Sequence, residues 1–140
     1  KTSTDMNNLL RLEELAYFSA CLFALIVADM PWWVYPILLL GPDIGMLGYL
    51  AGPRTGALTY NLLHHKGIAI ALMVSGMYLN ALTLFRTDDW NAQLILWTGV
   101  ILLGHASMDR IFGYGLKFGD NFHHTHLGWI GKARMQAQEQ

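Results

Sequence analysis

The sequence predicts an all-α protein, a four-helix transmembrane bundle with up-down-up-down connections. Three observations predict it. Of the 140 residues, 54% are hydrophobic and only 14% are charged, whereas ordinary soluble domains contain about 25% charged residues. Four stretches approach the roughly 20 apolar residues that a membrane-spanning helix needs. The connections between them are short, which favours antiparallel neighbours. We therefore expect one integral membrane domain over residues 1–140.

The predicted spans follow one another closely along the chain. The first covers about 12–30, with acidic residues only at its start. The second covers about 32–51 and is interrupted by Gly41, Pro42 and Asp43. The third covers about 67–85, although helical pattern extends back to residue 56, and the fourth covers about 92–108. A tail that contains histidines follows at 109–140.

The distribution of positive charge predicts the orientation of the spans. With four spans, the side that holds both termini carries eight lysines and arginines, whereas the other side carries only Arg86. Positively charged loops stay in the cytoplasm, so we expect both termini there. The formal net charge of −1 gives no reason to expect nucleic acid as a partner. We expect membrane lipids as partners, and the spacing of Gly45, Gly48 and Gly52 also allows close helix contact in a homodimer or larger membrane complex.

Several ionisable side chains lie in or beside the apolar spans, where each is a candidate for function because burying it in lipid is costly. Asp43 follows a proline inside the second span. His105 and Asp109 are four residues apart, so they share one helix face. Such a pair can bind one metal ion, or the carboxylate can hold the histidine in one tautomer. Arg110 follows directly and is a candidate for contact with an anionic group.

Further polar residues cluster before the third span and after the fourth. Asn61 and His64 lie on one predicted helix face, and His65 is next to them. Lys117 follows a glycine-containing turn. The tail then contains the last three histidines, at positions 123, 124 and 126. In the predicted topology all six histidines fall toward the cytoplasmic face, where a bundle can build a site between facing helices. Mixed histidine and carboxylate ligands suit zinc, iron or manganese.

The ordered motifs resemble a small, mainly bacterial family of four-span integral membrane proteins of unknown function. The resemblance extends from about Leu12 to Gly131 and implies the four-span fold in the inner membrane of a bacterium. The motifs that carry it are Gly-Pro-Asp43-Ile-Gly-Met-Leu-Gly-Tyr-Leu-Ala-Gly-Pro-Arg, Tyr60-Asn61-x-x-His64, His105-x-x-x-Asp109-Arg110, Gly113-Tyr114-Gly115-Leu116-Lys117 and Thr125-His126-Leu127-Gly128. His65, His123 and His124 do not match the family pattern. A weaker likeness links Pro42-Asp43 and His126 to membrane-bound metal-dependent hydrolases.

Two classes of function follow as hypotheses. The first is a metal-dependent membrane enzyme, a hydrolase of a lipid-like or amphipathic substrate. It would use His64, His105, Asp109 and His126 as metal ligands, Asp43 and Arg110 as catalytic residues, and Asn61 and Lys117 as cofactor-binding or substrate-binding residues. The second is a non-catalytic subunit that binds haem, a quinone, a pigment or a protein partner, with His64 and His105 as axial candidates. Transport of protons or metal ions through Asp43 is a third alternative.

Overall fold

The computed structural model describes residues 2–82 and 90–131, and it is mainly helical, as predicted. The end of the predicted third span, the loop with Arg86 and the polar end of the tail lie outside these ranges. The described helices are α1 (Thr2–Val27), α2 (Val34–Leu40), the 3₁₀ helix η1 (Gly41–Ala51), α3 (Pro53–His64), α4 (Lys66–Leu82) and α5 (Trp90–Ile111). Two short strands, β1 (His124–Thr125) and β2 (Gly128–Trp129), pair antiparallel near the end.

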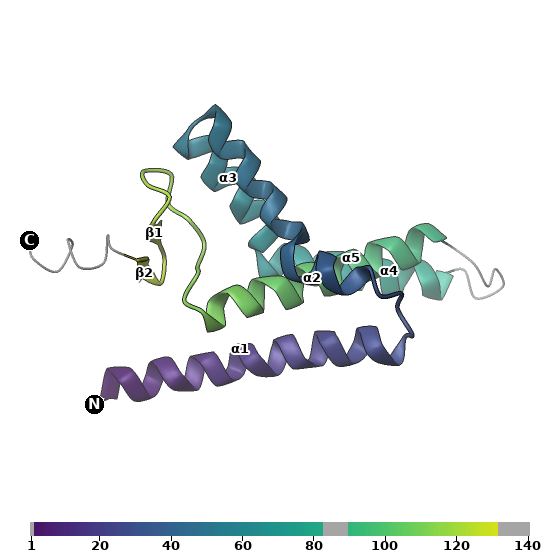
Figure 1. Ribbon diagram of the computed structural model, residues 1–140. Helices are drawn as coiled ribbons and strands as arrows, with labels where there is room; N and C mark the ends of the chain where they lie inside the picture. Colours follow the sequence, from purple (N-terminus) through teal and green to yellow (C-terminus); the bar gives the residue numbers. More distant parts are fainter. Residues whose placement is uncertain (1, 83–89, 132–140) are drawn as a thin grey trace, which may run out of the picture.

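Helix α5 is the centre of the arrangement. It packs against α1 on one side and α4 on another, and α4 and α5 lie side by side in Figure 1. Their approach is close at Gly76, because a Cβ atom there would lie 2.5 Å from the backbone nitrogen of Leu96. A cluster of buried apolar side chains joins α1, α2 and α5 through Cys21, Leu38 and Val100. This packing fixes α5, which carries part of the site.

Helices η1 and α3 form a hairpin whose tip projects away from α1, α4 and α5, while its base contacts α5 (Figure 1). Small residues allow its two arms to touch. A Cβ atom at Gly45 would lie 2.8 Å from the carbonyl oxygen of Thr59, and the Thr59 hydroxyl donates a hydrogen bond of 2.6 Å to the carbonyl of Gly45. Gly48 also faces Thr59. Two of the three glycines that suggested a dimer contact are therefore used inside the chain, and the homodimer stays a prediction.

The predicted interruption of the second span is a change of helix type. Proline at 42 lacks a backbone N–H, and α2 ends at Leu40 where η1 begins. The helix predicted to extend back to residue 56 is also present, but in two pieces. His65 has an extended backbone between α3 and α4, and the two helices are bent by 44° relative to each other. Within the described residues, the third span, expected from about 67 with helical pattern back to 56, is therefore a bent pair of helices rather than one continuous helix.

Two segments, Val34–Ala51 and Trp90–Ile111, are long and apolar enough to cross a membrane, and the bent pair of α3 and α4 makes a third. Many apolar side chains on these segments are exposed, including Leu50 at 89%, which indicates a membrane protein. Within the described ranges, α1 is not one of these segments, because Arg11, Glu13 and Glu14 lie in its first half. The fourth span, the up-down-up-down bundle and the orientation of the termini stay predictions.

Candidate metal centre

Four ionisable side chains meet where η1, α3 and α5 converge. Asp43 lies in the first turn of η1, and His64 is the last residue of α3. The hairpin places these two residues on neighbouring arms, at the end away from its tip. His105 and Asp109 lie one turn apart on α5, which packs against α3. Residues that are far apart in the sequence therefore share one site.

The distances within this group are those of metal ligands. Asp43 Oδ1 lies 3.5 Å from His64 Nε2 and 3.4 Å from His105 Nε2. Asp109 Oδ2 lies 3.4 Å from His64 Nε2, and Asp109 Oδ1 lies 3.8 Å from His105 Nε2. One donor atom from each residue lies within 4.8 Å of all the others. In tetrahedral zinc sites, bonds of about 2.0–2.2 Å place neighbouring donor atoms roughly 3.3–3.6 Å apart. Three of the four His–Asp separations lie in this range and the fourth is slightly longer, so small shifts of the side chains would let the group hold one divalent ion.

Backbone carbonyl groups orient both histidines. The Nδ1 atom of His64 lies 2.8 Å from the carbonyl oxygen of Tyr60, and the Nδ1 atom of His105 lies 2.9 Å from that of Leu38. Because a carbonyl can only accept a hydrogen bond, each ring donates from Nδ1, and in the neutral ring the lone pair is then on Nε2, the atom that faces the carboxylates. This second contact is the usual way to fix a metal-binding histidine.

Three atoms of the group are buried without a hydrogen-bond partner in the part of the chain that the structure describes. They are Asp43 Oδ1, His64 Nε2 and His105 Nε2. Buried polar atoms are nearly always satisfied, and all three of these are electron-pair donors that face one another. A divalent cation satisfies such a set. The histidine rings are sealed from solvent, but the Asp43 side chain is 32% exposed, so the group is accessible from that side.

Tyr60 is part of the site, although the sequence analysis assigned it no role. Its hydroxyl donates a hydrogen bond of 2.6 Å to Asp109 Oδ2, and its ring stacks on the His64 ring with centroids 3.7 Å apart. The side chain is 1% exposed. Tyr60 lies one helical turn before His64 and belongs to the same family motif, so the spacing was a usable signal, but a tyrosine in an apolar helix gave no reason of its own to expect a role at the site. Tyr60 therefore contacts two of the candidate metal ligands, His64 on α3 and Asp109 on α5.

Asn61 and Lys117 connect the hairpin to the segment after α5. The Asn61 amide donates to the Lys117 carbonyl at 2.8 Å and accepts from the Lys117 N–H at 2.7 Å. The Lys117 side chain is buried, with Nζ 5.0 Å from the centroid of the Tyr60 ring. Burial lowers the pKa of its amine, and the carboxylates of Asp109 and Asp43 oppose that shift. The Lys117 side chain therefore lies beside the metal cluster. The Asn61 side chain joins α3 to the backbone of the segment after α5.

Arg110 and His126 lie outside the group of four. Arg110 forms an ion pair of 3.6 Å with Glu14 on α1, so its guanidinium is directed away from Asp109. His126 Nδ1 accepts a hydrogen bond of 2.8 Å from the Leu116 N–H. Burial, followed by the charge of Arg110, lowers the pKa of His126. The roles predicted for these two residues at the metal centre stay predictions.

The remaining histidines are also separate from the group. His65 and His123 are exposed. His124 Nδ1 lies 2.7 Å from Asp120 Oδ2, and its ring stacks on Trp129 with centroids 4.5 Å apart. The sequence analysis had set these three histidines apart from the family pattern.

A family model described as a domain of unknown function, DUF4260, matches residues 7–130. The chain belongs to the DUF4260 family. No curated protein and no solved structure matches this DUF4260 chain. The matched region contains all four residues of the cluster together with Tyr60 and Lys117, so the site belongs to the part of the chain that defines the family. The resemblance to a family of unknown function is thereby confirmed, and the chemistry has to be argued from the site itself.

Proposed function

We propose that this protein is a metal-dependent membrane enzyme that hydrolyses a lipid-like or amphipathic substrate. The observation that supports the proposal most is a set of three buried atoms that can bind a metal and have no hydrogen-bond partner. One is an oxygen of Asp43, and the other two are the Nε2 atoms of His64 and His105. They lie beside a second carboxylate, from Asp109, at the spacing of metal ligands. A purely structural polar core would be expected to satisfy these atoms with one another.

Each side chain has a role in this proposal. His64, His105 and Asp109 hold the ion with the help of Tyr60, and Asp43 is a fourth ligand or the general base. A divalent ion at this position would activate water at neutral pH and polarise the bond to be cleaved. Asp43 is the most exposed of the four, so it is the residue best placed to accept a proton from an incoming water molecule. The Lys117 ammonium supplies positive charge for an anionic group of the substrate.

The arrangement of the histidines argues against the haem-binding alternative. Two axial ligands lie on opposite faces of a planar macrocycle, which separates their rings. Here the two ring centroids are 4.9 Å apart, and both Nε2 atoms face the same oxygen of Asp43. Two carboxylates occupy the region around these nitrogens, so a single small cation fits the site and a macrocycle does not.

The membrane setting supports the choice of substrate. The centre lies at the junction of segments that are apolar enough to cross a membrane, and exposed leucines line the outer face of η1 at positions 47 and 50. A substrate with an apolar chain can therefore approach through lipid, while Asp43 is the accessible member of the cluster.

Metal analysis of the purified protein, followed by assay, tests this proposal. The protein is purified in neutral detergent without a tag, and its metal content is measured for the wild type and for His64→Gln and Asp109→Asn. We expect about one zinc, iron or manganese ion per chain in the wild type and almost none in the variants. His65→Gln is the matched control, since this histidine is adjacent to a proposed ligand but exposed, and it should keep the metal.

Hydrolysis is then assayed with ester, amide and phosphate-ester lipids, before and after removal of the metal. Activity that disappears with chelation, returns with the metal and is absent from Asp43→Asn would support the enzyme. A folded wild-type protein that binds none of the three metals on reconstitution would refute the proposal at its first step. A protein that binds metal but cleaves no substrate class would leave a metal-binding role in place of catalysis.

A further inference from the structure

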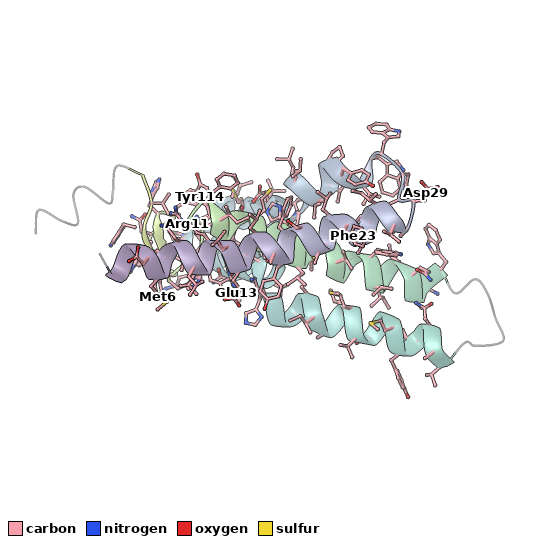
Figure 2. All side chains as sticks on the ribbon, turned by 90° about the horizontal axis from the view of Figure 1, so that it is seen from below. Met6, Arg11, Glu13, Phe23, Asp29 and Tyr114 are labelled. Carbon is pink, nitrogen blue, oxygen red and sulfur yellow. The ribbon has the colours of Figure 1, made fainter. Side chains whose placement is uncertain are left out.

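A cavity separate from the metal cluster lies between the first half of α1, the end of α5 and the β1–β2 hairpin. Its volume is about 730 Å³, within the range of roughly 300–1,000 Å³ that is usual for small-molecule sites. The residues that line it come from 7–14, 110–113 and 126–131. None of them belongs to the metal cluster. In Figure 1 the segments that border this cavity are α1 and the strands near the C-terminus, and Figure 2 labels Arg11 on the same part of α1.

The charged groups of this cavity favour an anion. Two arginines, Arg11 and Arg110, are among its lining residues, against one acidic residue, Glu14. Glu14 is already paired, with Lys66 from α4 and with Arg110 at 3.6 Å. The fork geometry of guanidinium suits phosphate oxygens. The cavity therefore combines excess positive charge with donors of the shape that a phosphate group needs.

His126 adds another donor to the same lining. Its Nδ1 accepts a hydrogen bond from the Leu116 N–H at 2.8 Å, so the neutral ring carries its proton on Nε2. The Gly115 backbone lies against the ring, because a Cβ atom at Gly115 would be 2.6 Å from His126 Nδ1. This close packing orients the imidazole without any contact with the metal cluster.

Apart from Asn7 and three glycines, the rest of the lining is apolar, which sets the ligand apart from a free ion. Leu10, Phe112, Leu127, Trp129 and Ile130 contribute to the cavity wall. Phe112 and Leu127 are 69% and 50% exposed, and Phe112 directly follows the membrane-spanning segment Trp90–Ile111. Apolar side chains beside two arginines at the end of a span match the boundary between acyl chains and headgroups.

We propose that this cavity binds the phosphate-bearing headgroup of an anionic lipid, with Arg11 and Arg110 as its principal contacts. The site is separate from the metal centre. Asp109 and Arg110 are consecutive residues of α5, yet the first contacts Tyr60 and the second contacts Glu14. The inference goes beyond the proposed hydrolase, and it does not depend on any reaction at the metal.

Lipid binding is measured by native mass spectrometry on the full chain in neutral detergent. Phosphatidylglycerol and phosphatidylcholine of identical acyl chains are compared, because they share a phosphate but only the first is anionic overall. The wild type should bind phosphatidylglycerol about tenfold more tightly, because the choline ammonium of phosphatidylcholine is repelled by the two arginines and cancels the net charge of the headgroup. The double variant Arg11→Gln, Arg110→Gln should lose this preference.

Two further variants separate binding from folding. Arg11→Gln alone changes an exposed side chain, so it should weaken the preference and leave the melting temperature unchanged. Arg54→Gln is the matched control, because this arginine is also exposed but lies at the start of α3 beside a different hollow. It should keep the full preference.

Three outcomes would overturn the proposal. Equal binding of the two lipids by the wild type would remove it, and so would a preference that survives in the double variant. A competition arm with inorganic phosphate distinguishes the source of the phosphate group. If millimolar phosphate displaces phosphatidylglycerol from the wild type and binds without any lipid, the site recognises a soluble phosphate and the lipid assignment is wrong.

Discussion

At the scale of single residues, the centre depends on hydrogen bonds that orient the ligands. His64 and His105 are each held by a backbone carbonyl, and Asp109 is held by the hydroxyl of Tyr60. Contacts of this kind restrict the side chain before a cation binds, so less conformational entropy is lost on binding. They also determine which atom of the side chain faces the cation. Tyr60 is the most informative of them, because it can be changed without removing a ligand.

Replacing Tyr60 by phenylalanine should weaken metal binding by about 10- to 100-fold, the usual effect of losing an outer-shell contact. The ring would still stack on His64, so the loss is that of the hydrogen bond to Asp109. Competition with a chelator of known affinity measures it. Tyr17→Phe, which removes an exposed hydroxyl 3.5 Å from Glu13 and keeps the ring that Lys66 contacts, should bind as the wild type does. Equal affinity in Tyr60→Phe would show that the hydroxyl does not support the ligand.

His126 should make the stability of the protein depend on pH. Its pKa is lowered in the folded protein, so the unfolded chain, with an ordinary value of about 6.5, takes up the proton first. Stability from this residue is therefore complete above about pH 6.5 and is lost as the pH falls through the lowered folded value. Protonation of Nδ1 would also break the bond from the Leu116 N–H.

The measurement compares melting temperatures between pH 7.5 and 5 for the wild type and His126→Asn. Asparagine can accept the Leu116 hydrogen bond but does not titrate, so the variant should lose less stability on acidification. Parallel curves would contradict the assigned direction of the shift.

The sequence was informative about residues wherever a charged or imidazole group interrupted an apolar stretch. Asp43, His64, His105 and Asp109 were all selected for that reason, and the structure brings them together. Tyr60 was missed because tyrosine is ordinary in such a helix. Its contact with Asp109 spans 49 positions, and no local pattern reveals a pairing at that separation. For the same reason, the sequence did not reveal that Arg110 is directed to Glu14.

At the scale of elements, the 3₁₀ helix η1 explains how an acidic residue is carried inside an apolar segment. A 3₁₀ helix has three residues per turn, so positions three apart lie in line. Gly45 and Gly48 form one line against α3, whereas Ile44, Leu47 and Leu50 form another that is exposed. From the sequence, the spacing of three and four residues between these glycines and the next one was taken to allow a close helix contact in a homodimer. The period of three, present in the sequence itself, was the available signal.

Substituting Gly45 by alanine should separate the two arms of the hairpin. The new Cβ atom would lie 2.8 Å from the Thr59 carbonyl oxygen and 3.1 Å from the Tyr60 Cα atom, and backbone atoms cannot rotate away. We expect a loss of about 1–3 kcal/mol of stability, typical of overpacking, and a lower metal content. The control is Gly119→Ala, where the nearest atom would be 3.4 Å away. Unchanged melting and metal content in Gly45→Ala would mean that the arms do not need this contact.

At the scale of the whole molecule, α1 decides the topology. Lys66 and Arg110 pair with Glu14 near the middle of α1, and the apolar second half of α1 packs on α5 through Cys21 and Leu25. If α1 crosses the membrane, four spans place both termini on one side. If it lies along the surface, three spans place them on opposite sides. Hydropathy alone does not show whether α1 crosses the membrane, because Arg11, Glu13 and Glu14 lie within the helix.

Labelling of single cysteines tests the orientation. In a Cys21→Ser background, cysteine is placed at Asn7 or at Asn121, and intact cells are treated with an impermeant maleimide. The excess of positive charge on the side of the termini predicts that both positions are protected and react only after lysis. Reaction of one position in intact cells would show that α1 does not span the membrane.

The change from α-helix to 3₁₀ helix also affects how far a short segment extends. Seven α-helical residues rise about 1.5 Å each, and eleven 3₁₀ residues rise about 2.0 Å each. Together Val34–Ala51 has a path of roughly 32 Å, compared with roughly 27 Å if all 18 residues were α-helical. A hydrocarbon layer is about 30 Å thick. The 3₁₀ half therefore gives this segment of only 18 residues a contour length comparable to that layer, and the chain turns within the segment, since α2 packs on α5 whereas η1 packs on α3 (Figure 1).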